Sequence, residues 1–227
     1  MSAARLAVSI HTLAPVADEG LVADAAVFDE LGCRAACVAT DIGGEIPDDL
    51  LARQIDALPG EAGRCAAARI GWVRAGQAAR VAAFVARAVP ESAVLAILPA
   101  CLEGNVRESL FPIARVVVVR AVDAPSWIGR TLTDLEDLPD AAARLRGDGA
   151  RAVLIAGFRA GARTVDLLDD GGRVALLDAP RIAAPHLPGI AGAHAAALAG
   201  HLARGAGLRD AAAAAQRYVA LRLTRGR

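Results

Sequence analysis

Lysine is absent from this sequence. All 25 basic residues are arginine, and 25 aspartate and glutamate residues balance them to a formal net charge of zero. Any phosphate-neutralising role therefore falls to arginine, whose planar guanidinium differs in geometry from an ammonium group. Without net charge the chain has no overall field that attracts polyanions or anionic lipid, so nucleic acid and membrane surfaces are not expected as partners.

Long apolar runs are also missing, although 55% of the residues are hydrophobic and can bury a sizeable core. No stretch approaches the roughly 18 apolar residues that a membrane-spanning helix needs. The opening residues, MSAARLAVSI, carry an apolar run too short for a signal peptide. We therefore expect a soluble, cytoplasmic protein.

Cysteine is scarce, and its spacing argues against a zinc site. Of Cys33, Cys37, Cys65 and Cys101, only the first two lie close together in the sequence, and no second pair completes a set of four ligands. We interpret all four as reduced, small core residues.

Apolar runs of strand length alternate with helical patterns, which predicts βα units and a mainly parallel sheet. No linker, repeat or charge run divides the pattern, so residues 1–227 are expected to form one domain. The stretch from Pro99 to Pro112 has too little periodicity to assign. Strands are expected over Leu6–Ile10, Ala35–Ala39, Ala67–Val73, Ala93–Leu98, Arg115–Val119 and Ala152–Ala156, then a hairpin of Thr164–Leu168 and Val174–Leu177. Helices are expected over Leu21–Leu31, from about Pro47, and over Gly76–Val89, Pro139–Arg146, Ile190–Arg204 and Leu208–Leu223.

Several segments follow one another as the motifs of a known enzyme family do. From Gly149 the chain reads GARAVLIAGF, then TVDLLDDGGRVALLDAPRI and an Ala-rich helix ending HLARG. Near the start, LAVSI, GLVADAAVFDELG and AARIGWV fall in the same register. From Leu6 to about Leu221 the chain thus resembles the hydroxymethylpyrimidine and phosphomethylpyrimidine kinases of thiamine biosynthesis, in the ribokinase-like superfamily.

This resemblance implies a three-layer αβα fold, with a mainly parallel central sheet between flanking helices. It also implies a homodimer, and the use of ATP to phosphorylate a hydroxymethylpyrimidine or its phosphate. The family's motifs allow four parts of such a site to be compared with this chain.

The first part is the anion hole, where the family's GTGC motif opens the penultimate helix and its cysteine stands where a base acts. A helix N-terminus still faces the site, but the last residue of the motif is now Gly192, which can neither take nor give a proton. His194 and His186 are nearby titratable groups, although two residues rotate the His194 side chain about 200° around the helix. The alternative for His194 is a packing or surface histidine. The anion-hole register holds Gly189, Ile190, Ala191 and Gly192.

The parts that bind the pyrimidine are changed too. The family's glycine-rich loop, GSDPSGGAGIQAD, corresponds to TLAPVADEGLVAD, where Ala14 replaces an acidic residue and Asp18 a glycine. In VATDIG, Asp41 replaces a glutamine, and a carboxylate only accepts hydrogen bonds. The resemblance places Ala14, Asp18 and Asp41 beside the substrate, with a solvated turn residue as the alternative for Asp41.

The nucleotide contacts have lost their lysine. At the positions of the family's TPN and KGGH runs, this chain reads VVR and AGFR, which end at Arg120 and Arg159. These two arginines are candidates for contacting a phosphate, and the alternative is that they are simply solvated. The acidic residue of the family's DPVM segment has no counterpart, so no metal ligand is assigned. In an active kinase, Asp18, Glu19 or Asp41 could bind Mg²⁺.

The joint loss of base, lysine and metal acid predicts weak or lost kinase activity, with a role in ligand binding or regulation. One alternative is an active, divergent pyrimidine or small-molecule kinase that uses ATP and Mg²⁺. Another is a structural or partner-binding module that needs no cofactor. The first two hypotheses imply a small-molecule pyrimidine or nucleotide as ligand.

Overall fold

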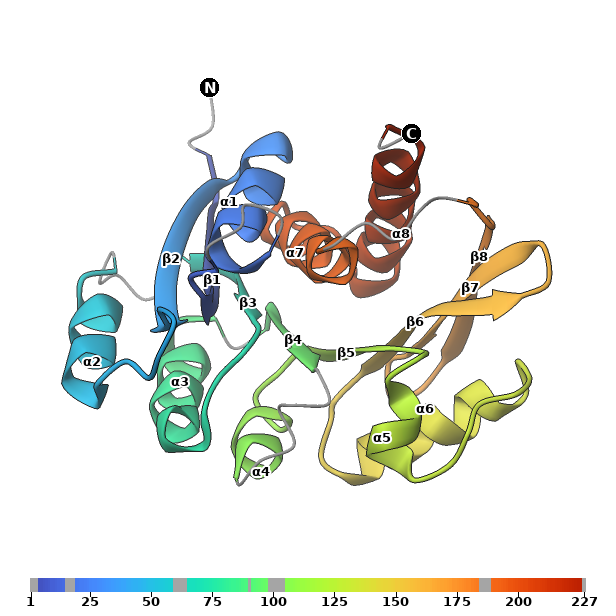
Figure 1. Cartoon of the computed structure of the whole chain (residues 1–227), viewed down its shortest axis with the longest axis horizontal. Coiled ribbons are helices and arrows are strands. Elements are labelled where there is room, and N and C mark those ends of the chain that lie inside the picture. The colour runs from blue at the N-terminus through green and yellow to red at the C-terminus, as the bar shows by residue number, and fades with distance from the viewer. Residues whose placement is uncertain are drawn as a thin grey trace.

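The computed structural model describes residues 4–14, 19–58, 65–89, 91–97, 105–183 and 189–225. These residues form an eight-stranded sheet in the order β2-β1-β3-β4-β5-β6-β7-β8, with helices on both faces (Figure 1). The strands are β1 (Leu6–Thr12), β2 (Arg34–Asp41), β3 (Cys65–Ile70), β4 (Ala93–Ile97), β5 (Val116–Arg120), β6 (Val153–Ala160), β7 (Arg163–Asp169) and β8 (Val174–Pro180). The helices are α1 (Gly20–Glu30), α2 (Asp48–Asp56), α3 (Ala75–Ala88), α4 (Val106–Leu110), α5 (Ala124–Ile128), α6 (Asp137–Gly147), α7 (Ile190–Ala203) and α8 (Leu208–Arg225).

Strands β1 to β6 pair in parallel, as the alternating pattern predicts. The strands β7 and β8 then pair antiparallel, which confirms the predicted hairpin. Strand β6 runs on to Ala160, beyond the predicted end at Ala156. The reason is Gly157, whose φ of 79° falls at a register shift between Ile155 and Phe158 and allows pairing to resume beyond it.

The sheet separates two hydrophobic cores, because successive side chains of a strand point to opposite faces. Val8 and Ile10 of β1 belong to one core, and Ala7 belongs to the other. Helices α1, α7 and α8 cover the second core, while α2 to α6 lie on the opposite side (Figure 1). The expected three-layer αβα arrangement is therefore confirmed.

Two short helices were not predicted. Helix α4 lies in the stretch that has too little periodicity to assign, and α5 follows β5, with Pro125 in its first turn. Each has five residues, which is too short for a repeating apolar stripe to appear in the sequence. Conversely, β3 ends at Ile70 and not at Val73, because its pairing with β1 stops there and residues 71–74 lead irregularly to α3.

In the part of the chain that the structure describes, no helix combines the length and the apolar character required to cross a bilayer.

Candidate functional site

The candidate site lies at the point of the sheet where the order of the strands reverses direction. Strand β1 lies between β2 and β3, so the chain leaves β1 toward one edge and returns past it to continue toward the other. In open α/β sheets, ligands bind at the carboxyl ends of the strands on either side of such a reversal. Here those ends carry His11 and Thr12 on β1, and Gly71 and Trp72 after β3.

A buried polar cluster lies just below these strand ends, on the face covered by α1 and α7. The hydroxyl of Ser9 donates to Oδ2 of Asp24 at 2.5 Å, and Nε of Arg69 lies 3.3 Å from the same oxygen. The side chains of Arg69 and Asp24 are only 4% and 1% exposed. Burial raises the pKa of the Asp24 carboxyl, and the nearby Arg69 charge and the Ser9 hydroxyl oppose this rise.

The Arg69 guanidinium extends from this cluster toward α7. A Cβ built on Gly71 would lie 1.9 Å from its Nη1, so glycine is needed there to leave room for the guanidinium. A Cβ built on Gly192 would lie 3.6 Å from its Nη2, which is ordinary contact distance. Arg69 therefore lies beside the position where the family resemblance places a catalytic side chain.

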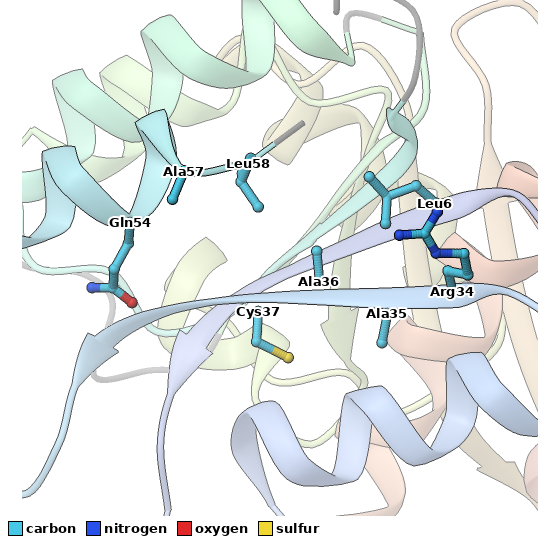
Figure 2. A pocket seen from close by; sticks show the side chains of 8 residues that line it. All are labelled: Leu6, Arg34, Ala35, Ala36, Cys37, Gln54, Ala57 and Leu58. Carbon is cyan, nitrogen blue, oxygen red and sulfur yellow. The ribbon is translucent and has the colours of Figure 1, made fainter. Parts of the chain in front are cut away.

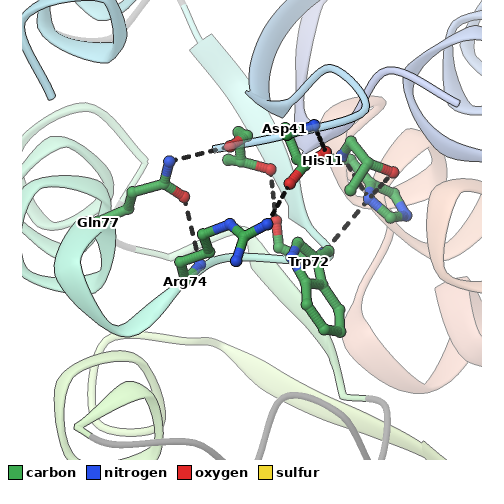
Figure 3. Close-up of polar contacts among 8 residues, drawn as sticks. His11, Asp41, Trp72, Arg74 and Gln77 are labelled. Carbon is green, nitrogen blue, oxygen red and sulfur yellow. Dashed lines mark hydrogen bonds and ion pairs between the residues drawn. The ribbon is translucent and has the colours of Figure 1, made fainter. Parts of the chain in front are cut away.

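His11 is a neutral neighbour of Arg69. Its Cδ2 would lie 2.6 Å from a Cβ on Gly71, so the ring and the guanidinium share the space above that residue. Burial, reinforced by the positive charge of Arg69, lowers the pKa of His11 to about 2. Its Nδ1 faces the backbone N–H groups of Thr12 at 2.7 Å and Trp72 at 3.3 Å, which places the ring proton on Nε2 (Figure 3).

Asp41, predicted to contact a substrate, lies at the end of β2 in a network that joins it to the start of α3 (Figure 3). Arg74 donates from Nη2 to its Oδ2 at 2.6 Å, and Gly44 N–H donates to its Oδ1 at 3.0 Å. The hydrogen bond from Arg74 is the main reason why the pKa of Asp41 lies below its ordinary value. Gln77 completes the network by donating to the carbonyl of Thr40 at 2.9 Å. Both carboxylate oxygens of Asp41 are thus engaged within the chain.

The predicted anion-hole residues meet at the start of α7. Gly189 adopts a left-handed φ of 74° as the residue before the helix, and its carbonyl accepts the first intrahelical bond from Ala193 at 2.8 Å. The N–H groups of Ile190, Ala191 and Gly192 precede that bond and have no intrahelical acceptor. They point out of the helix at its positive end.

His194 does not join this terminus. Its Nε2 lies 3.6 Å from Oδ2 of Asp166 on β7, and both side chains are buried. Asp166 also accepts from Gly157 N–H at 2.7 Å, and burial raises the pKa of its carboxyl. His194 is thus packed between α7 and the sheet, in keeping with the packing alternative.

The other predicted residues are dispersed. Arg120 is held by Asp123 through two nitrogens, one of them Nη2 at 2.7 Å from Oδ1. Arg159 is exposed near the end of β6 and forms no ion pair with any residue that the structure describes. Ala14 follows β1 and is half-buried, whereas Asp18 and His186 lie outside the described residues. Within the described ranges, no three His, Cys, Asp or Glu side chains are arranged to hold a metal ion.

Sequence reasoning missed Ser9, Asp24 and Arg69 as members of the site. A signal for two of them was present, because Ser9 and Arg69 are polar residues inside otherwise apolar strands, where an unpartnered polar group is costly. Asp24 gave a different signal, because it is one of the few residues of TLAPVADEGLVAD that match the family's loop.

A pocket of about 350 Å³ lies elsewhere, between the outer edge of β2 and α2 (Figure 2). Leu6 and Arg34, which line it, open β1 and β2. It therefore lies toward the amino ends of these strands, away from the carboxyl-end cluster. Its other lining residues are Ala35, Ala36, Cys37, Gln54, Ala57 and Leu58.

Known proteins resemble this chain in both sequence and fold. Residues 16–226 match the family model described as phosphomethylpyrimidine kinase. Over 114 residues the chain is 37% identical to the thiamine biosynthesis bifunctional protein ThiED of Geobacter sulfurreducens. That alignment covers 50% of this chain and 23% of the relative, so the chain spans less than a quarter of that protein.

Solved structures share the whole architecture. The pyridoxal kinase of Staphylococcus aureus in complex with AMP-PCP aligns with a TM-score of 0.88 and 21% identity, covering 98% of this chain and 89% of that one. The ADP complex of Bacillus subtilis pyridoxal kinase aligns with a TM-score of 0.85 and 22% identity, covering 95% of this chain and 90% of that one. The phosphomethylpyrimidine kinase of Clostridium difficile 630 aligns with a TM-score of 0.79 and 16% identity, covering 96% of this chain and 99% of that one. At such identities the likeness establishes a shared fold, and it confirms the ribokinase-like fold expected from the sequence.

Proposed function

Because the chain belongs to the phosphomethylpyrimidine kinase family, we propose that it uses the family scaffold to bind a small molecule, with weak or lost phosphoryl transfer. Its role would then be in ligand binding or regulation. The observation that carries this proposal is the missing side chain at Gly192, the position where the family resemblance places a base. Gly192 has no side chain, and the space next to it contains the Arg69 guanidinium.

The titratable neighbours of Arg69 in the described part of the chain cannot easily replace such a base. His11, with a pKa of about 2, stays neutral at physiological pH and holds a proton only weakly. A general base works best when its pKa is near the operating pH. Asp24 is buried below the strand ends and already bonded to Ser9 and Arg69.

Two groups in the described part of the chain are suited to the phosphates of a nucleotide. Bound MgATP would supply the γ-phosphoryl group, and the N-terminus of α7 together with the exposed Arg159 would be the groups able to hold its phosphates. The Arg120 charge is already offset by Asp123. Phosphoryl transfer depends on positioning and charge stabilisation, so a kinase site without lysine and without a side chain at Gly192 is expected to lower the barrier little.

The test is a product assay with MgATP and hydroxymethylpyrimidine, its phosphate, or pyridoxal. We expect turnover to be about 100-fold or more below the 1–100 s⁻¹ typical of kinases. Gly192→Cys returns a titratable side chain and should raise any residual rate about tenfold or more, whereas Gly76→Ala on the exposed start of α3 should not. Turnover at ordinary enzyme rates in the unmodified protein would reject the proposal.

An active, divergent kinase is the second candidate, favoured by the α7 terminus and the exposed Arg159. A thermal shift with MgATP tests whether the protein binds the nucleotide, because any ligand that binds only the native state raises the melting temperature. Stabilisation by MgATP together with product formation would favour the kinase. Stabilisation without product would favour the binding role.

A further inference from the structure

We propose that His194 and Asp166 share one proton, and that this proton makes the packing of α7 on the sheet depend on pH. His194 lies in the second turn of α7, and Asp166 lies on β7, which pairs antiparallel with β6. The pair therefore joins the helix to the antiparallel part of the sheet. This inference goes beyond the proposed function, because it needs neither a ligand nor turnover.

The pair lacks the hydrogen bond that its burial requires. The two side chains are only 9% and 2% exposed, and Nε2 of His194 lies 3.6 Å from Oδ2 of Asp166. Both atoms are buried and have no hydrogen-bond partner among the residues that the structure describes. Buried polar atoms are almost always hydrogen-bonded in native proteins, and a slight approach of these two atoms would form the bond. A proton between them is what this bond needs.

Burial favours the form of the pair that carries no net charge. With one titratable proton, the pair is either an imidazolium beside a carboxylate or a neutral imidazole beside a carboxylic acid. Without that proton, a single carboxylate charge stays away from water, which is costly. Burial accordingly raises the pKa of the Asp166 carboxyl, although the His194 charge, the Gly157 N–H and the Gln216 side chain oppose this rise. We expect the pair to keep its proton to a higher pH than the same groups would in water.

The neighbours of the pair add little charge to it. Among the described residues, His194 is the one whose charge acts on the Asp166 carboxyl. The group that faces this carboxyl from α8 is the Gln216 amide, which is uncharged. Strands β4 and β5 contribute valines to the core beneath α7, namely Val94, Val116 and Val118.

Charged groups elsewhere around α7 lie away from the pair. Arg69 of β3, paired with Asp24 of α1, meets the helix at Gly192. Two residues separate Gly192 from His194, which turns the two positions about 200° apart around the helix. Near the other end of α7, the charges that act on His201 are those of Arg204 and Arg217. The proton of the pair is therefore governed mainly by its own two members and by burial.

Asp166 also contacts two further elements, so its protonation acts beyond the pair. Its Oδ1 accepts from Gly157 N–H at 2.7 Å, at the register shift of β6. Gln216 bonds to the same carboxyl and donates to the Leu177 carbonyl of β8 at 2.8 Å. When the shared proton leaves, water can reach the carboxylate only if these contacts open locally. The protonated pair thus holds α7 against the sheet, and the deprotonated pair favours opening.

The direction of the pH dependence follows from the number of protons bound. In water an aspartate loses its proton at about pH 4 and a histidine at about pH 6.5, so a hydrated pair holds one proton between these values and none above them. The closed pair still holds one proton above pH 6.5. Local opening then releases a proton, so its equilibrium constant rises by up to about tenfold per pH unit until the closed pair is deprotonated too.

The experiment is amide hydrogen exchange followed by NMR from about pH 4 to pH 9, corrected for the intrinsic exchange rate at each pH. The amides to follow are that of Gly157 and those of α7. We expect their protection to fall above about pH 6.5, by up to about tenfold per pH unit. The chemical shift of the Gly157 amide should titrate together with the His194 ring. His11 and His201 do not confuse this range, because the pKa of each is lowered.

Asp166→Asn removes the shared proton and keeps the shape. Its amide offers an acceptor to Gly157 N–H and a donor to His194, and it does not titrate. We expect protection in this variant to stay constant above pH 6.5. His201→Gln is the matched control, because it removes a histidine from the same helix that does not belong to the pair. It should behave as the unmodified protein does.

A second variant keeps the test decisive if Asp166→Asn does not fold. His194→Leu leaves the Asp166 carboxyl alone in its buried place, with an apolar side chain of similar size beside it. A lone aspartate loses its proton in water at about pH 4, so opening is favoured from that pH upward. We therefore expect the fall in protection to begin at about pH 4 in this variant, and not at about pH 6.5.

Three results would overturn the shared proton. The first is protection that does not change with pH in the unmodified protein, and the second is an equal fall in Asp166→Asn. The third is a fall in His194→Leu that begins at the same pH as in the unmodified protein, since His194 would then hold no part of the proton. None of these results depends on the kinase assay, so the inference and the proposed function stand or fall separately.

Discussion

At the scale of single residues, the contact between Asp24 and Arg69 places two opposite charges where water does not reach them. Removing one partner leaves the other buried and uncompensated, which is far more costly than removing both. We expect Asp24→Ala to lower the free energy of unfolding by about 3–5 kcal/mol, measured by urea denaturation. Asp49→Ala breaks the exposed pair with Arg53 and should change stability too little to measure, because water screens that pair. Comparable losses in the two variants would contradict a buried charge pair.

His11 makes stability depend on pH in a defined direction. Its folded pKa, about 2, lies below its ordinary value of 6.5, so below about pH 6.5 the unfolded chain binds a proton that the folded protein does not. Stability from this group is therefore complete above pH 6.5 and falls as the pH drops, by up to about 1.4 kcal/mol per pH unit. His11→Gln should remove this part of the slope between pH 6.5 and about pH 5. If the free energy of unfolding changes with pH by the same amount in both proteins across that range, His11 is not buried as a neutral ring.

The sequence predicted some of these residues better than others. It placed Gly189 to Gly192 at a helix N-terminus, and the structure brings them together there. It could not foresee that Asp41 would be paired with Arg74, since the two side chains come from separate βα units and only the parallel packing of β2 and β3 around β1 brings them close. The position of Arg69 inside an apolar strand signalled a buried charge, but the sequence could not show its partner, because Asp24 comes from α1, far away in the chain.

At the scale of elements, Gly20 fixes the start of α1. Its φ is 69°, and a Cβ there would lie 2.3 Å from the carbonyl oxygen of Thr12, which is backbone and cannot move aside cheaply. Gly20→Ala should therefore lower the free energy of unfolding by about 2 kcal/mol or more.

Gly76, in the first turn of α3, is the matched control. It has ordinary φ and nothing within 4 Å of an added Cβ. Gly76→Ala should be neutral or stabilising by up to about 1 kcal/mol, because alanine loses less backbone entropy in a helix. Urea denaturation of both variants compares them, and a similar cost at the two positions would mean that the turn before α1 is not tightly packed.

The elements that the sequence predicted well are the long or fully buried ones. Strand β5, with four consecutive valines, is buried on both faces and was predictable because parallel strands covered by helices read as continuous apolar runs. Helices α4 and α5 were missed because five residues make little more than one turn. Their positions depend on packing against the core, where Leu110 of α4 and Trp127 of α5 are buried.

At the scale of the whole molecule, one sheet connects both halves of the chain, so we predict that residues 1–227 unfold as a single domain. The two tryptophans allow a direct test, because Trp72 follows β3 and Trp127 lies in α5, at a distance along the sheet. Trp72→Phe and Trp127→Phe each leave one fluorescent reporter. In each variant, fluorescence and far-UV circular dichroism should show the same urea midpoint, as two-state unfolding requires. Separate midpoints would divide the chain into two units.

The buried polar cluster is expected to form late in folding, because its members are widely spaced along the chain. Strands β6, β7 and β8 are joined by short turns and can pair soon after they are synthesised, whereas β1 must wait for β3 and then for α7. Contacts between distant segments form late, since closing a long loop is entropically unfavourable until other contacts hold it. We therefore expect that nascent chains ending before α7 leave Arg69 and Asp24 hydrated, and that this cluster is the last part of the protein to become buried.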